Sequence, residues 1–379
     1  MLGNFLTVLI GPTLPVPAPA ELMANLEQVS VQLSDSGRNG FQLSFRVGRD
    51  SLFGVVDYPP LLSQMLRPGF RVVVISTIEA FPHVISDGII TNVQLTPSSE
   101  PNGSRISVTG QDVSVMMEMI EQKLPYPGMP DFGIVNAILA KYAMYQVTPI
   151  AIPPPGDIPP LPTEKMPIAD GSDYAILTNL AARYGYVFWV QAGPAPLQNL
   201  AYWGPPFRIP VPQRALSFRL GSASNLGNVS FTSDALAPAV WAGVVQEKNS
   251  QAPVPVIGLP INVPPLATMP AWVGSAPLVP VKLMTDDFGG DVAKAYAKAI
   301  GESSKSSLSS TTASGELDVG NYGSVLRARE LVGVRGVGLT YDGLWYVKSV
   351  THTISPGSHK QSFKLEREGT ISSTPMVMP

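Results

Sequence analysis

The chain has 379 residues, enough for two or three domains, and only 14% of them are charged, against roughly 25% in an ordinary soluble domain. The net charge of −3 does not support binding to nucleic acid or to a membrane surface, and the absence of cysteine excludes disulfides and thiolate metal sites. No apolar run approaches the roughly 18 residues of a membrane-spanning helix, so the mean hydropathy of +0.17 favours a surface buried in an assembly over a large private core.

The N-terminal region is predicted to be all β. Residues 5–10 form an apolar run before Gly11-Pro12, which favours a strand followed by an extended proline arm. A secretory signal peptide is the alternative, but it needs a basic start, and the first basic residue is Arg38. Residues 29–33 and 41–47 alternate apolar and polar around a turn segment, which predicts a hairpin with one buried face.

An α/β insertion is predicted next, because the apolar spacing changes from two residues to three or four. Asp112 and Asp131 are suited to cap two helices. A third helix is predicted to start at Ser172-Asp173 and to stop at Gly185, before a strand at residues 186–190.

Two proline-rich stretches, 149–167 and 253–280, are predicted as extended connectors or packed arms, with plain surface loops as the alternative. Residues 291–300 predict one more helix. The Ser/Thr-rich residues 303–314 are predicted to be mobile or irregular.

A faint repeat links residues 66–108 with residues 326–365. Each segment contains an apolar strand, an Asp-Gly pair, a second strand, a turn and a third strand. We therefore predict two copies of one β unit, with Asp87-Gly88 and Asp342-Gly343 as turns that set the strand register. Two copies per chain would let three chains build a ring with six-fold character.

Residues suited to catalysis are scarce. The three histidines are His83, His352 and His359, and the last two flank a Pro-Gly turn, so they could meet across a hairpin. Without a carboxylate-rich cluster they make a poor metal site. The glycine-rich residues 333–338 do not match a phosphate loop, and no nucleophile elbow is present. We expect no catalytic residue, no cofactor and no metal.

Three arginines, Arg327, Arg329 and Arg335, give the second β unit a positive edge. Arginine is favoured at protein interfaces, so they are our interface candidates, with a solvated strand face as the alternative. The acidic residues Asp286, Asp287 and Asp291 are interpreted as parts of a loop or a helix cap.

The motifs together resemble the hub proteins of contractile phage tails and tail-like injection systems, the late control D family that is related to the hub portion of VgrG. The resemblance looks closest to the extracellular-type injection systems. It rests on the order and spacing of several pieces, including SDGIITNV at 86–93 and DGLWYVKSVTH at 342–352. The other pieces are residues 67–72, 106–112, 132–142, 172–186, 202–205 and 363–367.

The resemblance implies a mainly β fold with an α/β insertion, and a homotrimer in which two tube-forming β-barrels per chain alternate around a pseudo-six-fold ring. The implied function is a non-enzymatic baseplate hub that adapts a six-fold inner tube to a three-fold spike and lines the central channel. Inner tube, spike and baseplate wedge proteins would be its partners. Assembly in the bacterial cytoplasm is expected, without direct membrane insertion. Because the chain ends soon after Arg367, we expect the spike to be a separate protein.

Two other functions remain as alternatives. A cell-wall hydrolase or peptidase within residues 112–206 would need a polar cluster there, but the acidic residues of that segment sit mostly beside prolines or at helix caps. These residues are Asp131, Asp157, Glu164, Asp170 and Asp173. A secreted β-sandwich adhesin is the second alternative.

The predicted domains follow from these patterns. They are a first β-barrel with its N-terminal arm at 1–111, the α/β insertion at 112–206, a second β-barrel at 207–240 and 306–369, a proline-rich extension plus helix at 241–305, and a flexible tail at 370–379.

Overall fold

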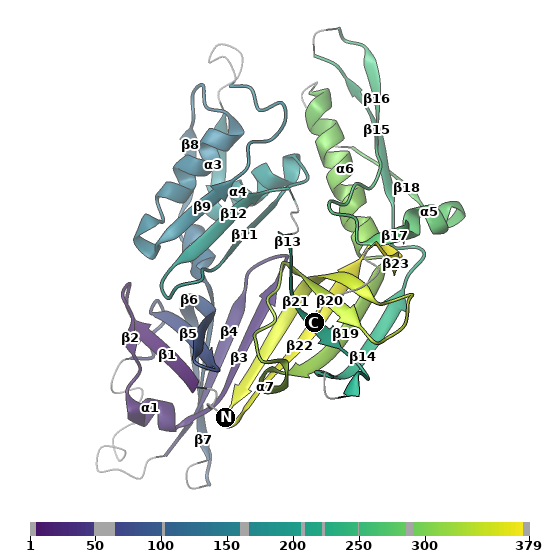
Figure 1. Ribbon diagram of the computed structural model, residues 1–379. Helices are drawn as coiled ribbons and strands as arrows, with labels where there is room; N and C mark the ends of the chain where they lie inside the picture. The colour runs from purple at the N-terminus through teal and green to yellow at the C-terminus, as the bar shows by residue number, and fades with distance from the viewer. Residues whose placement is uncertain are drawn as a thin grey trace.

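A long sheet and two inserts that project from it in the same direction make up the molecule (Figure 1). The computed structural model describes residues 5–48, 65–100, 103–159, 167–205, 209–221, 224–248, 250–285 and 291–373. The predicted sites Glu164, Asp286 and Asp287 lie outside these residues. None of the described helices combines the length and hydropathy that a membrane crossing requires.

The N-terminal half of the sheet, here called the first unit, has the spatial strand order β1-β5-β6-β7-β4-β3, with every neighbour antiparallel. Its strands are β1 (Phe5–Gly11), β3 (Leu26–Ser34), β4 (Gly40–Val47), β5 (Arg71–Ile78), β6 (Phe81–Thr96) and β7 (Ser104–Asp112). The short strand β2 (Val16–Pro17) pairs with β1, and helix α1 (Ala20–Ala24) leads from β2 into β3.

The C-terminal half, here called the second unit, has the order β13-β20-β21-β22-β19-β14. Its strands are β13 (Ile209–Ser217), β14 (Leu226–Ser233), β19 (Thr311–Asp318), β20 (Glu330–Arg335), β21 (Gly343–Ser355) and β22 (Ser358–Arg367). Strand β13 runs parallel to β20, and the other neighbours are antiparallel. Helix α7 (Val319–Tyr322) follows β19.

The two units share one spatial strand order, and they differ in that β1 runs antiparallel to β5 whereas β13 runs parallel to β20. Taken in chain order, the six strands of the second unit occupy the same spatial places as the six strands of the first unit. The predicted repeat falls on β5–β7 and β20–β22, each of which is a three-stranded antiparallel meander. The repeat is therefore confirmed as a repeated strand arrangement.

The predicted pair of closed barrels is not what the single chain forms. Its described sheets are open, and the strand path ends at β14 on one side and at β2 on the other. The physical reason is that β3 does not close the first unit. It pairs antiparallel with β21 of the second unit instead, from Val29 opposite Ile354 to Ser34 opposite Ser349.

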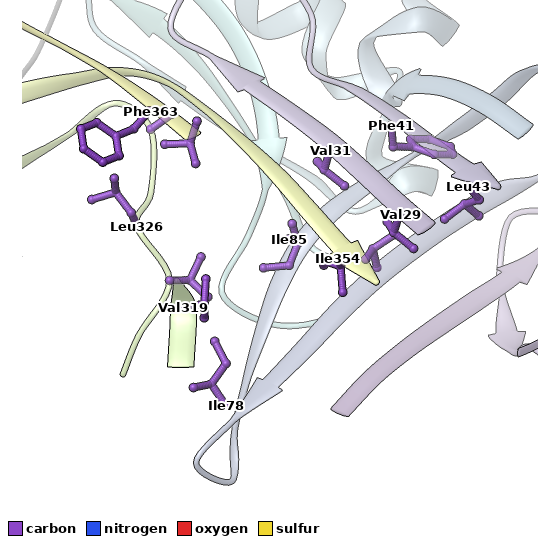
Figure 2. Packing of buried hydrophobic residues seen from close by; sticks show 14 of the residues in the cluster. Val29, Val31, Phe41, Leu43, Ile78, Ile85, Val319, Leu326, Ile354 and Phe363 are labelled. Carbon is purple, nitrogen blue, oxygen red and sulfur yellow. The ribbon is translucent and has the colours of Figure 1, made fainter. Parts of the chain in front are cut away.

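One hydrophobic core spans both units because β3 and β21 are neighbours. Val29 and Val31 of β3 are fully buried together with Val350 of β21. Figure 2 shows Val29 of the first unit beside Ile354, which comes from a yellow strand of the second unit.

The first insert lies between β7 and β13 and has its own apolar cluster, centred on Leu177 and Trp203. Trp203 is completely buried, and its indole N–H donates to the carbonyl of Leu177 at 3.1 Å. The helices are η1 (Val113–Glu118), α3 (Asp131–Ala140), η2 (Ala143–Tyr145) and α4 (Asp173–Arg183), and the strands are β8 (Glu121–Pro125), β9 (Val147–Ala151), β10 (Ile168–Ser172), β11 (Val187–Ala192) and β12 (Asn199–Gly204).

The predicted helix starts of this insert agree with the structure except at one cap. Asp112 accepts from the N–H of Ser114, and Ser172 accepts from the N–H of Ala175. Asp131 is the first residue of α3 but does not cap it. The carboxylate of Asp157 accepts from the first two N–H groups of this helix instead, each at 2.8 Å.

The second insert lies between β14 and β19. Its strands β15 (Val240–Gln246), β16 (Pro253–Gly258) and β18 (Val281–Leu283) form a sheet against which helix α6 (Val292–Leu308) packs. Strand β17 (Ala267–Pro270) pairs with β23 (Gly369–Ser372), and α5 (Ala271–Gly274) and η4 (Ala276–Leu278) follow β17. The second proline-rich stretch, residues 253–280, thus contains hydrogen-bonded strands, which the prediction of a connector or arm did not include.

Two predicted irregular segments are ordered instead. Helix α6 continues to Leu308, and its serines bond to the backbone at the start of β15: Ser303 accepts from the N–H of Trp241, and Ser306 accepts from the N–H of Ala239 and donates to its carbonyl. Residues 311–314 belong to β19. The predicted tail begins as strand β23, since the side chain of Glu368 accepts from the backbone of β17 and holds the two segments together.

Candidate functional site

Several strand edges of the long sheet carry no partner strand among the described residues, including the outer edges of β2 and β13, and two of them are long and polar on their exposed side. One is the outer edge of β14, and the other is the second half of β6, residues 92–96, beyond the part that pairs with β5. In both segments exposed polar residues alternate with half-buried apolar ones, such as Leu95 and Phe231. Unpaired backbone donors and acceptors make such edges templates for another strand.

A buried ion pair connects the first unit to the first insert. Arg71 of β5 donates from Nε and Nη2 to the two carboxylate oxygens of Asp87 on β6, both at 2.7 Å, and neither side chain is exposed by more than 1%. Arg71 also donates to the carbonyls of Leu197 at 2.6 Å and Tyr145 at 3.3 Å. Asn199 donates to Asp87 at 3.2 Å.

The prediction of a turn at Asp87-Gly88 is therefore wrong. Both residues lie inside β6, opposite Val73 and Val72, and the chain turns at Glu79-Ala80 instead. Burial raises the pKa of Asp87 above its usual range, and the Arg71 guanidinium opposes this shift. An Asp-Gly pair is common in turns, but here it places a buried carboxylate beside a glycine inside a strand. Only the contact with Arg71 distinguishes the buried pair from a turn.

Arg329 joins both units and the first insert. It is 6% exposed, and its guanidinium donates to Gln191 at 3.0 Å and to the carbonyl of Ser34. The same group lies 4.6 Å from the centre of the Trp189 ring. Arg329 is thus an internal contact, which corrects its prediction as an intermolecular interface residue. Its burial lowers the pKa of the guanidinium.

The backbone of Arg329 is strained, because its φ is +70°, a conformation that favours glycine. We expect Arg329→Gly to lower the free energy of unfolding by about 1–3 kcal/mol, since lost hydrogen bonds to a charged group outweigh the relieved strain. Arg329→Ala should be about 1 kcal/mol worse, because alanine keeps the strain. Urea titrations measure both.

Gly69 is the matched control, since it has φ +90° with open space around it. Gly69→Ala should therefore cost about 1 kcal/mol through strain alone. An Arg329→Gly variant more stable than the parent protein would show that the guanidinium contacts contribute nothing.

The remaining predicted site residues lie just before β20, at the end of β20 and at the start of β21. Arg327 is exposed, and Arg335 donates to the hydroxyl of Ser217 at 2.7 Å. Asp342 accepts from the N–H of Val337 at the end of this connection, and Gly343 is the first residue of β21. A Cβ at Gly343 would lie 1.9 Å from the Ser372 hydroxyl, so β23 leaves room only for glycine there.

His352 and His359 do meet across their hairpin, with Nδ1 of His352 at 3.1 Å from Nε2 of His359. The amide N–H of Gln361 donates toward Nε2 of His352, so His352 carries its proton on Nδ1 and donates to His359. His359 then donates from Nδ1 to the hydroxyl of Ser76 on β5. The relay joins the two units and is satisfied only when both imidazoles are neutral.

Acid is expected to weaken this junction. Burial lowers the pKa of His352 to about 3 and that of His359 to about 4, from 6.5 in the unfolded chain. Below pH 6.5 the unfolded chain binds protons that the native chain does not, so stability falls as pH decreases. Between pH 7 and pH 5 the loss should reach roughly 2 kcal/mol per imidazole, at about 1.4 kcal/mol per pKa unit.

His352→Gln should remove about half of that pH dependence, and His352→Gln with His359→Gln nearly all of it. His83→Gln is the control, because His83 is half-buried outside the relay. Urea unfolding at pH 7, 6 and 5 tests the prediction, and an unchanged slope in the double variant would contradict it.

The carboxylates of the first insert have structural partners. Asp131 accepts from the hydroxyl of Tyr184 at 2.8 Å, and the nearby Asp157 caps α3. Asp173 accepts from Lys141 and Tyr142, and Asp170 pairs with Lys123. Within the described ranges, no group of three or more His, Asp or Glu side chains is arranged to hold a metal ion.

The inserts approach each other at Gly185 and Gly301, where a Cβ on Gly301 would lie 2.8 Å from the Cα of Gly185. Gly185 also has the predicted positive φ, +65°, after α4. A cavity of about 700 Å³ lies beside this contact, lined by aromatic residues such as Tyr186 and Trp189 and by Ser304 of α6. Two acids, Asp35 and Glu366, line it, and Glu366 is paired with Lys348 at 2.6 Å.

The outer face of the second insert's sheet is apolar and exposed. Val244, Ile257 and Leu283 lie on the face opposite α6 and are exposed by 69%, 56% and 75%. Exposed apolar surface of this kind is typical of a protein that contacts partners.

Comparison with known proteins places the fold. No family model matches the sequence, and no curated protein matches it. A tail protein from Neisseria meningitidis MC58 superposes with a TM-score of 0.62 at 14% identity, covering 96% of this chain and 97% of that chain. The 43 kDa tail protein of prophage MuSo2 from Shewanella oneidensis gives a TM-score of 0.64 at 10% identity, covering 97% and 99%.

A third similar structure is the E. coli c3393 protein, a component of the type VI secretion system with structural similarity to the T4 bacteriophage tail proteins gp27 and gp5. Its TM-score is 0.50 at 10% identity, covering 94% of this chain and 78% of that chain. At these identities the likeness establishes the fold. The resemblance to tail hub proteins that the motifs indicated is confirmed at that level.

Proposed function

We propose that this chain is a structural hub of a contractile, phage-tail-like particle, in which three copies form a ring of six β units. The observation that carries the proposal is the repeated topology: one chain contains two six-stranded units with the same spatial strand order. Three such chains would present six similar β units on one side of the ring and three copies of the pair of inserts on the other side. The likeness to tail proteins over nearly the whole chain supports this role.

A ring of this kind would adapt a six-fold inner tube to a three-fold spike. The long sheet would line the channel and the inserts would lie outside it, in contact with baseplate wedge proteins. Closed symmetry then requires that superposing the two units corresponds to a step of about 60° around the ring axis. Assembly of the particle would take place in the bacterial cytoplasm.

A structural role is favoured over the hydrolase and peptidase alternatives. The acidic residues described in the first insert cap helices or pair with cations rather than converge on a free space. The ring nitrogens of the buried His352–His359 pair are occupied by hydrogen bonds that stabilise the junction of the two units.

Native mass spectrometry and electron microscopy of the purified protein, alone and mixed with tube and spike proteins of its own particle, test the proposal. The expected result is a trimer whose projections show a ring with six similar densities. A stable monomer that joins neither partner would refute the hub role.

A further inference from the structure

The internal repeat assigns partners to two of the open strand edges, that of β14 and that of residues 92–96 of β6. We infer that β14 of one copy pairs antiparallel with the second half of β6 of a second copy, in the register in which β3 pairs with β21 inside the chain. This inference rests on the proposed ring and specifies the contact that closes it.

The register follows from bulges that mark equivalent positions in the two units. In the first unit, the pairing of β6 with β7 shifts between Ile90 and Asn92. In the second unit, the pairing of β21 with β22 shifts between Val347 and Ser349. Ile90 therefore corresponds to Val347. The backbone agrees, because the N–H of Gly69 donates to Ile90 as the N–H of Arg329 donates to Val347.

The other end of each unit gives an independent check. Following the strand partners from β6 through β7 and β4, and from β21 through β22 and β19, makes Val31 of β3 equivalent to Phe231 of β14. The same alignment predicts that the bulge in β3 between Leu26 and Gln28 recurs in β14. It does, between Leu226 and Asn228.

Inside the chain, Val31 of β3 lies opposite His352 of β21. The equivalent pair between two copies is Phe231 opposite Leu95. The neighbouring pairs are then Thr232 with Gln94, Ser233 with Val93, and Ser230 with Thr96.

The two faces of the strands agree with this register. Leu95 and Phe231 both pack against the hydrophobic core of their own unit, whereas Gln94 and Thr232 are exposed. Pairing Leu95 with Phe231 therefore continues the apolar face of the sheet from one copy into the next. A slip by one residue would turn every apolar side chain to the opposite face.

The edges also lack the features that prevent pairing. Natural edge strands are usually blocked by charged residues, proline or a covering element. Strand β14, with the sequence LGNVSFTS, contains neither a charged residue nor proline, and residues 92–96 of β6, NVQLT, contain neither. An unprotected edge that matches an edge on the same molecule is suited to a second copy of this chain.

Disulfide trapping tests the register, and the chain contains no cysteine to interfere. The N–H of Asp35 donates to Lys348, so alternation makes Gln32 and Thr351 a non-hydrogen-bonded pair, and likewise Thr232 and Gln94 between copies. Cα atoms in such pairs are about 4.5 Å apart, within the range of a disulfide. Thr232→Cys with Gln94→Cys should give covalent trimers on oxidation.

Two matched pairs control the trapping. Gln32→Cys with Thr351→Cys should form a disulfide within one chain, without a change in chain mass beyond two hydrogens. Thr232→Cys with Asn92→Cys is displaced by two residues, beyond the roughly 7 Å limit of a disulfide, and should give no crosslink.

A proline variant tests the pairing without cysteine. The N–H of Asp234 donates to Ser310 of the same chain, so the N–H of Ser233 points outward to the proposed partner. Ser233→Pro removes that donor and leaves the pairing with β19 intact. We expect loss of the trimer with an unchanged melting temperature of the monomer, whereas Ser233→Thr should remain trimeric.

The outcomes separate the inference from the proposed function. A trimer that survives Ser233→Pro and is not trapped by the Thr232/Gln94 cysteines overturns the edge pairing while the hub ring stands. Trapping by the displaced Thr232/Asn92 pair alone overturns the register. A parent protein that stays monomeric at micromolar concentration overturns both the ring and the pairing.

Discussion

Replacing Arg71 with leucine is expected to lower the free energy of unfolding by about 3–5 kcal/mol. The change leaves the carboxylate of Asp87 buried without its counter-charge, and burial already raises the pKa of this group. It also removes the donor that the backbone carbonyls of Tyr145 and Leu197 share. The cost should therefore fall on the docking of the first insert as well as on β5 and β6.

Urea unfolding measures the loss, and hydrogen exchange locates it. Amides of β9 and β12 should lose protection before those of β3 and β4, because Arg71 holds the insert. Arg105→Leu is the control, since Arg105 is 63% exposed and pairs with Glu27 at the surface. It should cost less than about 1 kcal/mol. Equal effects of the two substitutions would contradict the role of the buried pair.

Phe41→Ala is expected to cost about 3–5 kcal/mol. Phe41 is 4% exposed, and its ring fills the space above two glycines: a Cβ on Gly110 would lie 2.2 Å from the ring, and one on Gly88 would lie 3.0 Å from it. Neither glycine can fill the cavity that alanine leaves. The core that joins both units would lose the aromatic ring that fills this space.

Phe5→Ala is the matched control, because Phe5 of β1 is 64% exposed in the same sheet. It should change stability by less than about 0.5 kcal/mol. Thermal and urea unfolding compare the two variants. A Phe41→Ala protein as stable as Phe5→Ala would show that the ring is not packed as described.

Sequence patterns determined the local elements of this protein. The alternation of residues 41–47 predicted β4, and Ser172-Asp173 with Gly185 predicted α4, because periodicity and capping depend on neighbours in the chain. The low charge pointed to a surface buried in an assembly, and the two distant segments with a shared order of strands and turns pointed to a repeated β unit.

The tertiary structure decided how the units fit together, and it explains why the repeat is faint in sequence. In the first unit Phe41 lies opposite Gly110, and in the second unit the equivalent residues are Ala313 opposite Leu365. Packing requires a filled volume rather than a particular residue, so large and small side chains can exchange places across a strand pair.

The polar junctions were decided by partners far apart in the chain. Asp87 became a buried ion-pair residue through Arg71 and Asn199, and Arg329 became internal through Ser34 and Gln191. A single sequence gives such partners no signal, because they meet only when strands from both units and the first insert pack together. Local propensity thus determined the strands and helices of this chain, and long-range packing decided which charged residues lie inside it and which strand edges remain open.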